Sequence, residues 1–137
     1  MKALNYHNNS FIGASNRSSL IDLVIPADFN GKLILFIHGF MGYKDWGAWN
    51  LMQDFFTNKG FGFCKYNVSH NGTTIENPTE FSDLTAFANN SYSNELADLT
   101  GALNWLETQM DNLPKIYLVG HSRGGGIALL GSKDDRI

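Results

Sequence analysis

Two periodicities of apolar residues alternate along this 137-residue chain. Short, almost continuous apolar runs rich in β-branched and aromatic residues predict buried β-strands at residues 20–25, 32–38, 61–68 and 115–119. Apolar residues that recur every three or four positions predict helices at residues 46–58 and 92–110. This alternation favours an α/β fold, with a mostly parallel sheet and helices on both of its faces.

Turn-forming and polar residues refine the ends of these elements. Pro26 ends the first run, which we interpret as an antiparallel leader to the sheet. Residues 1–18 are rich in Asn and Ser and predict an edge strand or an irregular arm. Asp45 is a candidate N-cap for the helix at 46–58. The run at 61–68 is more mixed, so we expect it to be exposed along one face.

A long loop is predicted at residues 69–91, anchored by the apolar residues Phe81, Leu84 and Phe87. Structureless loops of this length are uncommon unless they serve a site. In the helix that follows, Asp98 lies off an apolar stripe that consists of Leu96, Leu99, Leu103 and Leu106.

Composition narrows the classes of partner. The net charge is −3 and only 17% of residues are charged, so no basic face is expected and nucleic acid and anionic membranes are excluded as partners. No run approaches the length of a membrane span, and the start lacks an apolar signal region, which favours a cytoplasmic protein of one domain or part of one.

Cys64 stands alone inside an apolar run and is predicted to be a packed side chain. No spacing of His and Cys suits a metal, and no cofactor is expected.

Residues 120–124, Gly-His-Ser-Arg-Gly, form a candidate catalytic turn between the last predicted strand and a Gly-rich helix that runs to about residue 130. The two glycines permit a sharp turn that projects the Ser122 hydroxyl from the sheet over the helix N-terminus. There the backbone N–H of Arg123 would point at the negative charge that develops on an attacked carbonyl oxygen. The alternative interpretation is a turn serine that only caps the helix.

A second segment, residues 32–42, joins this turn in a pattern that resembles the α/β-hydrolases, in particular the serine esterase and dienelactone-hydrolase-like group. An apolar strand ending in His-Gly-Phe looks like the strand and loop that donate the other oxyanion N–H in that family. The resemblance implies Ser122 as nucleophile and the N–H groups of Phe40 and Arg123 as oxyanion donors, with Met41 as the alternative to Phe40. It implies a small-molecule acyl substrate.

The resemblance runs from about residue 20 to the end of the chain and covers the amino-terminal half of the family's fold, with the later strands missing. The family places its acid and its histidine after the serine, so we expect both beyond Ile137 and a largely inactive chain. Within the chain, His38 is predicted to pack under the oxyanion loop, His70 to be a solvated loop residue and His121 to make a structural hydrogen bond. The Arg123 side chain is expected at the surface or in an interhelical salt bridge.

Several functional alternatives stay open. The first prediction is a serine hydrolase of carboxylic esters or similar acyl compounds, with a peptidase or thioesterase of the same fold as a near alternative. A non-catalytic binding or scaffolding protein on the half fold is the other. In either case the strand at 115–119 would lie at an open sheet edge, which predicts dimerisation or aggregation. Aromatic and apolar residues near the oxyanion loop could line an acyl pocket, although half or more are expected in the core: Phe40, Met41, Tyr43, Trp46 and Trp49.

Overall fold

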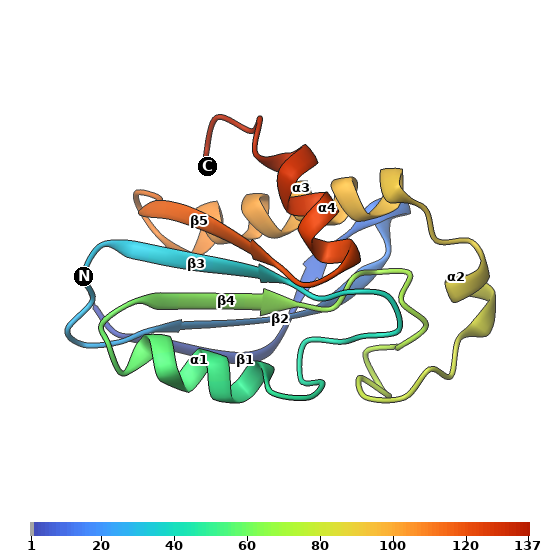
Figure 1. Ribbon diagram of the computed structural model, residues 1–137, viewed down its shortest axis with the longest axis horizontal. Helices are drawn as coiled ribbons and strands as arrows, with labels where there is room; N and C mark the ends of the chain where they lie inside the picture. Colours follow the sequence, from blue (N-terminus) through green and yellow to red (C-terminus); the bar gives the residue numbers. More distant parts are fainter. Residues whose placement is uncertain (1) are drawn as a thin grey trace.

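The computed structural model describes residues 2–137 and has a five-stranded mixed sheet with helices on both faces (Figure 1). The strands are β1 (Leu4–Ile12), β2 (Ser18–Ile25), β3 (Lys32–Ile37), β4 (Gly62–Tyr66) and β5 (Lys115–Gly120). The α-helices are α1 (Trp49–Thr57), α2 (Leu84–Ala88), α3 (Tyr92–Gln109) and α4 (Arg123–Gly131), and a short 3-10 helix η1 spans Ala14–Asn16.

The strand order is β1-β2-β4-β3-β5, and the parallel part is β4-β3-β5. The strand β2 runs antiparallel to β4, which confirms the leader predicted at residues 20–25, and β1 pairs with β2 as an edge strand within the predicted arm. The crossover from β3 to its neighbour β4 contains α1, and the crossover from β4 past β3 to β5 contains α2 and α3, because parallel strands need such long connections. The strand β5 forms the other edge, beside β3.

The two faces of the sheet bury different clusters, because side chains alternate along a strand. Leu33, Leu35 and Ile37 of β3 lie in the larger cluster together with Leu99 and Leu103 of α3. Ile34 and Phe36 of the same strand lie in a smaller cluster, against which Trp49, Met52 and Phe56 of α1 pack. Figure 1 shows α1 on one side of the sheet and α3 and α4 on the other.

The helix predicted at 92–110 is confirmed as α3, and Ser91 caps it by accepting a hydrogen bond from the Asn94 N–H. Asp98, predicted to lie away from the apolar stripe, is nevertheless fully buried. Its carboxylate accepts hydrogen bonds from the backbone N–H groups of Ala14 at 2.7 Å and Ser69 at 2.9 Å. A buried carboxylate therefore ties α3 to η1 and to the segment after β4, and the two backbone donors replace its lost hydration.

Two predictions around α1 and β4 are wrong. The helix begins at Trp49 rather than residue 46, it follows Ala48 without a side-chain cap, and Asp45 instead forms ion pairs. Every residue of β4 is buried, contrary to the expected exposed face, because the Lys65 ammonium is paired with carboxylates inside the protein.

The segment predicted as a loop at 69–91 contains α2, which Asp83 caps by accepting from the Ala86 N–H. Two of the expected anchors make aromatic contacts: the Phe81 ring lies 6.0 Å from that of Tyr43, and the Phe87 ring 5.6 Å from that of Phe40. Leu84 is exposed and anchors nothing, so that prediction is wrong. None of the helices within residues 2–137 has the length and apolar character to cross a membrane.

Candidate active site

Ser122 occupies the sharp turn that joins β5 to α4. Its backbone has φ 53° and ψ −120°, a conformation that costs a non-glycine residue on the order of 1–3 kcal/mol. The flanking glycines are required sterically. A Cβ at Gly120 would lie 2.2 Å from the Gly124 carbonyl oxygen, and a Cβ at Gly124 would lie 2.1 Å from the Ile37 carbonyl oxygen. The chain can therefore make this turn only with glycine on both sides of the serine.

The Ser122 side chain is exposed and does not cap α4, so the interpretation of a merely capping serine is wrong. Within residues 2–137 its hydroxyl has no hydrogen-bond partner. A hydroxyl in this position projects over the first turn of a helix, where the positive end of the helix dipole lies.

The loop after β3 lies directly against this turn. A Cβ at Gly39 would come within 2.9 Å of the His121 carbonyl oxygen and 3.2 Å of the Ser122 Cβ. The His121 N–H also donates to the Ile37 carbonyl at 3.0 Å, which joins the ends of the two parallel strands. The predicted oxyanion segment and the predicted nucleophile are thus neighbours.

His38 fixes the peptide that follows Gly39. Its Nε2 accepts a hydrogen bond from the Val68 N–H at 3.0 Å, so the ring proton sits on Nδ1, which donates to the Gly39 carbonyl at 3.0 Å. In a trans peptide the C=O and N–H groups point in opposite directions. The Phe40 N–H is therefore directed away from His38. Burial lowers the pKa of His38 to about 4, and the prediction that it packs under the loop is confirmed.

Arg123 is the first residue of α4, so its backbone N–H is among the donors that have no acceptor within the helix. Its side chain makes the interhelical salt bridge that was predicted as one of two options. The guanidinium Nε donates to the Glu95 carboxylate of α3, and the guanidinium carbon lies 4.2 Å from the centre of the Tyr92 ring. Burial raises the pKa of Glu95, while the Arg123 charge acts in the opposite direction. The pattern of α3 gave no sign that Glu95 would be buried.

The remaining histidines of the region do not reach the serine. His70 Nδ1 lies 2.8 Å from the Ser69 hydroxyl. His121 is exposed and its ring centre lies 5.0 Å from that of Trp49, a ring contact in place of the predicted hydrogen bond. Across residues 2–137, no histidine is hydrogen-bonded to the Ser122 hydroxyl.

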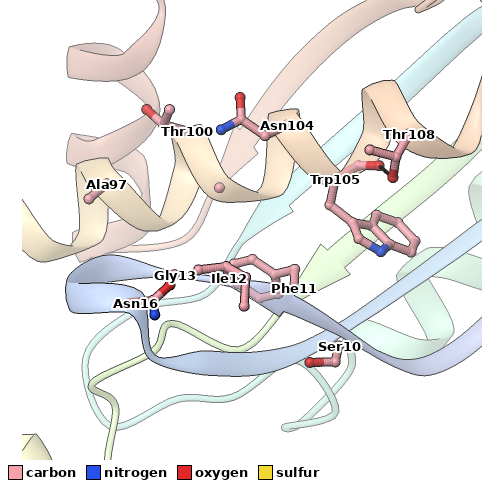
Figure 2. Close-up of a pocket in the computed structure, with 11 residues that line it drawn as sticks. Ser10, Phe11, Ile12, Gly13, Asn16, Ala97, Thr100, Asn104, Trp105 and Thr108 are labelled. Atoms are coloured by element: carbon pink, nitrogen blue, oxygen red, sulfur yellow. Dashed lines mark hydrogen bonds between the residues drawn. The ribbon is translucent and has the colours of Figure 1, made fainter.

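Small cavities surround the loop, and a larger groove lies elsewhere. One cavity of about 50 Å³ is bounded by Gly39, Met41, Trp49 and His121, and another of about 180 Å³ lies between Phe40, Glu95 and Arg123. Phe40, Met41 and Trp46 are exposed rather than mostly core. A groove of about 550 Å³ lies between β1 and α3, lined by residues such as Ile12, Asn104 and Trp105 (Figure 2). None of its lining residues belongs to the serine turn or the loop.

The strand–turn–helix around Ser122 and the adjoining loop on a parallel sheet define the class of α/β-hydrolase folds. A family model described as the alpha/beta hydrolase fold matches residues 32–131, and the chain belongs to this family.

Solved structures show the same fold at low sequence identity. A dienelactone hydrolase of Anabaena variabilis superposes with a TM-score of 0.73 at 22% identity, over 98% of this chain and 59% of that one. Est1E of Butyrivibrio proteoclasticus, solved with ferulic acid bound, superposes with a TM-score of 0.68 at 20% identity, over 89% of this chain and 46% of Est1E. An esterase of Pyrococcus furiosus superposes with a TM-score of 0.69 at 13% identity, over 98% of this chain and 48% of the esterase.

The chain therefore spans about half the length of these structures. A search of curated proteins found no match.

Proposed function

We propose that this chain carries the nucleophile and the oxyanion site of a serine hydrolase that acts on carboxylic esters or similar acyl compounds. The Ser122 Oγ attacks the acyl carbon, and the carbonyl oxygen becomes an oxyanion that accepts hydrogen bonds from the N–H groups of Phe40 and Arg123. Collapse of this intermediate expels the alcohol and leaves an acyl-serine. Attack of water on the acyl-serine then releases the acid.

The proton balance defines what else the reaction needs. A general base must take the Oγ proton and return it to the leaving alcohol, and it must then take a proton from the water. Residues 2–137 hold no histidine against Ser122, so in this proposal the base and the acid that orients it come from outside these residues. Each preorganised N–H donor contributes on the order of 10²–10³ in rate in such sites.

One observation carries the proposal most directly: the strained, exposed backbone of Ser122 beside Gly39. Strained backbones persist where the surrounding structure determines them, and they gather at functional sites. The esterases and the dienelactone hydrolase with the same fold support the reaction class by analogy.

Because the base is proposed to lie outside residues 2–137, two measurements test the proposal in a preparation that includes every segment of the natural protein: hydrolysis of 4-nitrophenyl acetate and covalent labelling by a fluorophosphonate. We expect both to report on Ser122, with the label found by mass spectrometry on the peptide that contains it. The Ser122→Ala variant should reduce hydrolysis to the buffer background and abolish labelling. The matched control is Ser93→Ala, an exposed serine of α3. A Ser122→Ala variant as active as the parent protein would reject the proposal.

A non-catalytic binding protein is the second candidate, favoured by the lack of a base against Ser122 in residues 2–137. The same labelling experiment separates the two functions. A binding protein would leave Ser122 unlabelled even in a preparation that includes every segment of the natural protein.

A further inference from the structure

Four charged side chains are buried together behind the loop that carries Phe40. Asp22 of β2 and Lys65 of β4 face each other in the strand register, with Lys65 Nζ 2.6 Å from Asp22 Oδ2. The loop supplies the other two charges. Lys44 Nζ lies 3.1 Å from Asp22 Oδ1 and 2.7 Å from Asp45 Oδ2, while Lys65 Nζ lies 2.8 Å from Asp45 Oδ1. We call these four residues the charge quartet.

The formal charges of the two lysines and two aspartates of the quartet balance, and Nδ1 of the mostly exposed His7 also lies 3.3 Å from Asp22 Oδ1. Both lysine side chains are fully buried, the Asp22 side chain is 3% exposed and that of Asp45 18%. Asp22 also accepts a hydrogen bond from the Asn8 N–H at 2.8 Å. Burial acts to raise the pKa of Asp22, but the hydrogen bond from the Asn8 N–H, together with Lys65 and Lys44, holds it below its usual value. Burial also acts to raise the pKa of Asp45, and the two lysines lower it to about 2. Both carboxyl groups of the quartet are therefore ionised at neutral pH.

Stability alone does not account for such an arrangement. Taking ions out of water costs several kcal/mol per ion, and apolar side chains of similar volume often give equal or greater stability. An apolar cluster, however, accepts several side-chain packings, whereas each ammonium here requires two particular carboxylates. The quartet therefore specifies where the Lys44-Asp45 end of the loop sits on the sheet.

Two hydrogen bonds between uncharged groups also fix the loop, closer in the chain to the proposed oxyanion donor Phe40. The Lys44 N–H donates to Asn67 Oδ1 at 2.7 Å, and Asn71 Nδ2 donates to the Gly42 carbonyl at 3.1 Å. Phe40 and Met41 lie in the chain between His38 and these two hydrogen bonds. The backbone φ of Met41 is 56°. A strained residue in an exposed loop needs both ends of the loop fixed.

We infer that Lys44 and Asp45, held by Asp22 and Lys65, are positioning residues that keep the Phe40 N–H aimed at the acyl oxygen above Ser122. This inference rests on the proposed function for its catalytic meaning. Whether the charge quartet fixes the path of residues 39–45 does not depend on that function.

Amide hydrogen exchange of the double variant Lys44→Met/Asp45→Ala tests the inference. The variant keeps the net charge and leaves the Lys65–Asp22 pair intact. We expect an unfolding midpoint close to that of the parent protein but exchange at the amides of residues 42 and 44 faster by about tenfold or more, because the loop opens locally. The matched control is Asp134→Ala/Arg136→Met, which removes a charge-neutral pair at 2.8 Å elsewhere and should leave both amides unchanged.

Unchanged exchange at both amides in a folded double variant would overturn the inference. If that variant does not fold, Asp45→Asn replaces it, because Asp45 is the most exposed member of the quartet. Asp45→Asn should also speed exchange at Gly42 and Lys44 while the β3 and β4 amides keep their rates, and parent-like loop exchange again overturns the inference.

Kinetics provide the second measurement, again in a preparation that includes every segment of the natural protein. For 4-nitrophenyl acetate the double variant should lose about tenfold or more in kcat with little change in KM, since a misplaced donor weakens the transition state selectively. An unchanged kcat in the presence of faster loop exchange would overturn the catalytic role. If Ser122→Ala matches the parent protein, the proposed function fails, whereas the exchange result still decides whether the quartet fixes the loop.

Discussion

The Glu95 carboxylate of α3 accepts a hydrogen bond from Arg123, the residue whose backbone N–H we propose as an oxyanion donor. Asn90 Nδ2 donates to the same carboxylate at 3.2 Å, and the Tyr92 ring lies against the guanidinium. The first residue of α4 is thus held by a side chain from another helix. Breaking this pair leaves a partly buried cation without its partner.

We expect Glu95→Ala to lower the free energy of unfolding by about 2 kcal/mol, less than a fully buried pair would lose because the Arg123 side chain is 23% exposed. Urea unfolding measures the change. Glu107→Ala is the control, since its side chain is 51% exposed in the pair with Arg136, and it should change stability by less than about 1 kcal/mol. Equal effects of the two substitutions would contradict the assigned role of Glu95.

His38 predicts a pH dependence of stability. Its folded pKa is lowered from 6.5 to about 4 by burial, so the unfolded chain takes up the proton first as pH falls. Stability is fully present above pH 6.5 and declines by about 3 kcal/mol as the pH falls to about 4. The difference between the parent protein and His38→Gln in urea unfolding, measured across this window, isolates the contribution from those of the carboxylates. A difference that does not vary with pH would refute a neutral buried His38.

Two glycines of α4 make a matched pair. A Cβ at Gly124 would lie 2.1 Å from the Ile37 carbonyl oxygen, whereas a Cβ at Gly126 meets no atom within 4 Å. Gly124→Ala should therefore destabilise the protein by about 3 kcal/mol or more, because the obstacle is backbone. Gly126→Ala should stabilise it by about 0.5–1 kcal/mol through helix propensity. Thermal unfolding of both variants checks the contrast, and a tolerated Gly124→Ala would mean that β3 and α4 are not this close.

The edge strand β5 predicts self-association of this chain. Within residues 2–137 it pairs with β3 alone, and Tyr117 on β5 and Leu129 on α4 are 38% and 77% exposed. Unpaired edges with apolar neighbours favour strand pairing between molecules. We expect concentration-dependent dimers or larger species in sedimentation velocity, reduced by Tyr117→Lys. Leu51→Lys is the control, because Leu51 is 71% exposed on α1, away from the edge. A monomer at all concentrations would contradict this expectation.

Local patterns were enough to predict the parallel strands, α3 and the turn at Ser122. Continuous apolar runs have few alternatives to a buried strand, and the five residues from Gly120 to Gly124 contain the steric requirements of the turn within themselves. The resemblance to the α/β-hydrolases linked residues 32–42 with this turn, and in the structure Gly39 packs against it.

The charged interior could not be predicted in this way. The mixed run that contains Lys65 predicted an exposed face, and Asp45 was predicted to cap a helix. Both predictions failed because the partners of these residues lie on other elements, and the register of β2 with β4 brings them together. Asp98 was misplaced for the same reason: the backbone donors that satisfy it are 84 and 29 residues away in the chain. The opposite charges of Asp22 and Lys65 on adjacent strands could have indicated a buried ion pair, but only if the register of the two strands had been known.

Both proposed oxyanion donors belong to the main chain, and the side chains at these two positions point to other partners. The proposed chemistry therefore constrains the backbone path, which at Met41 has a φ of 56°, and requires no particular side chain at residue 40. Phe40 is exposed and lines the same small cavity as Arg123, so in the proposed function we expect substitutions at this position to alter which acyl compounds are accepted without altering the catalytic groups. A library restricted to position 40 would explore substrate range while the strands, the turn and the buried charges stay constant.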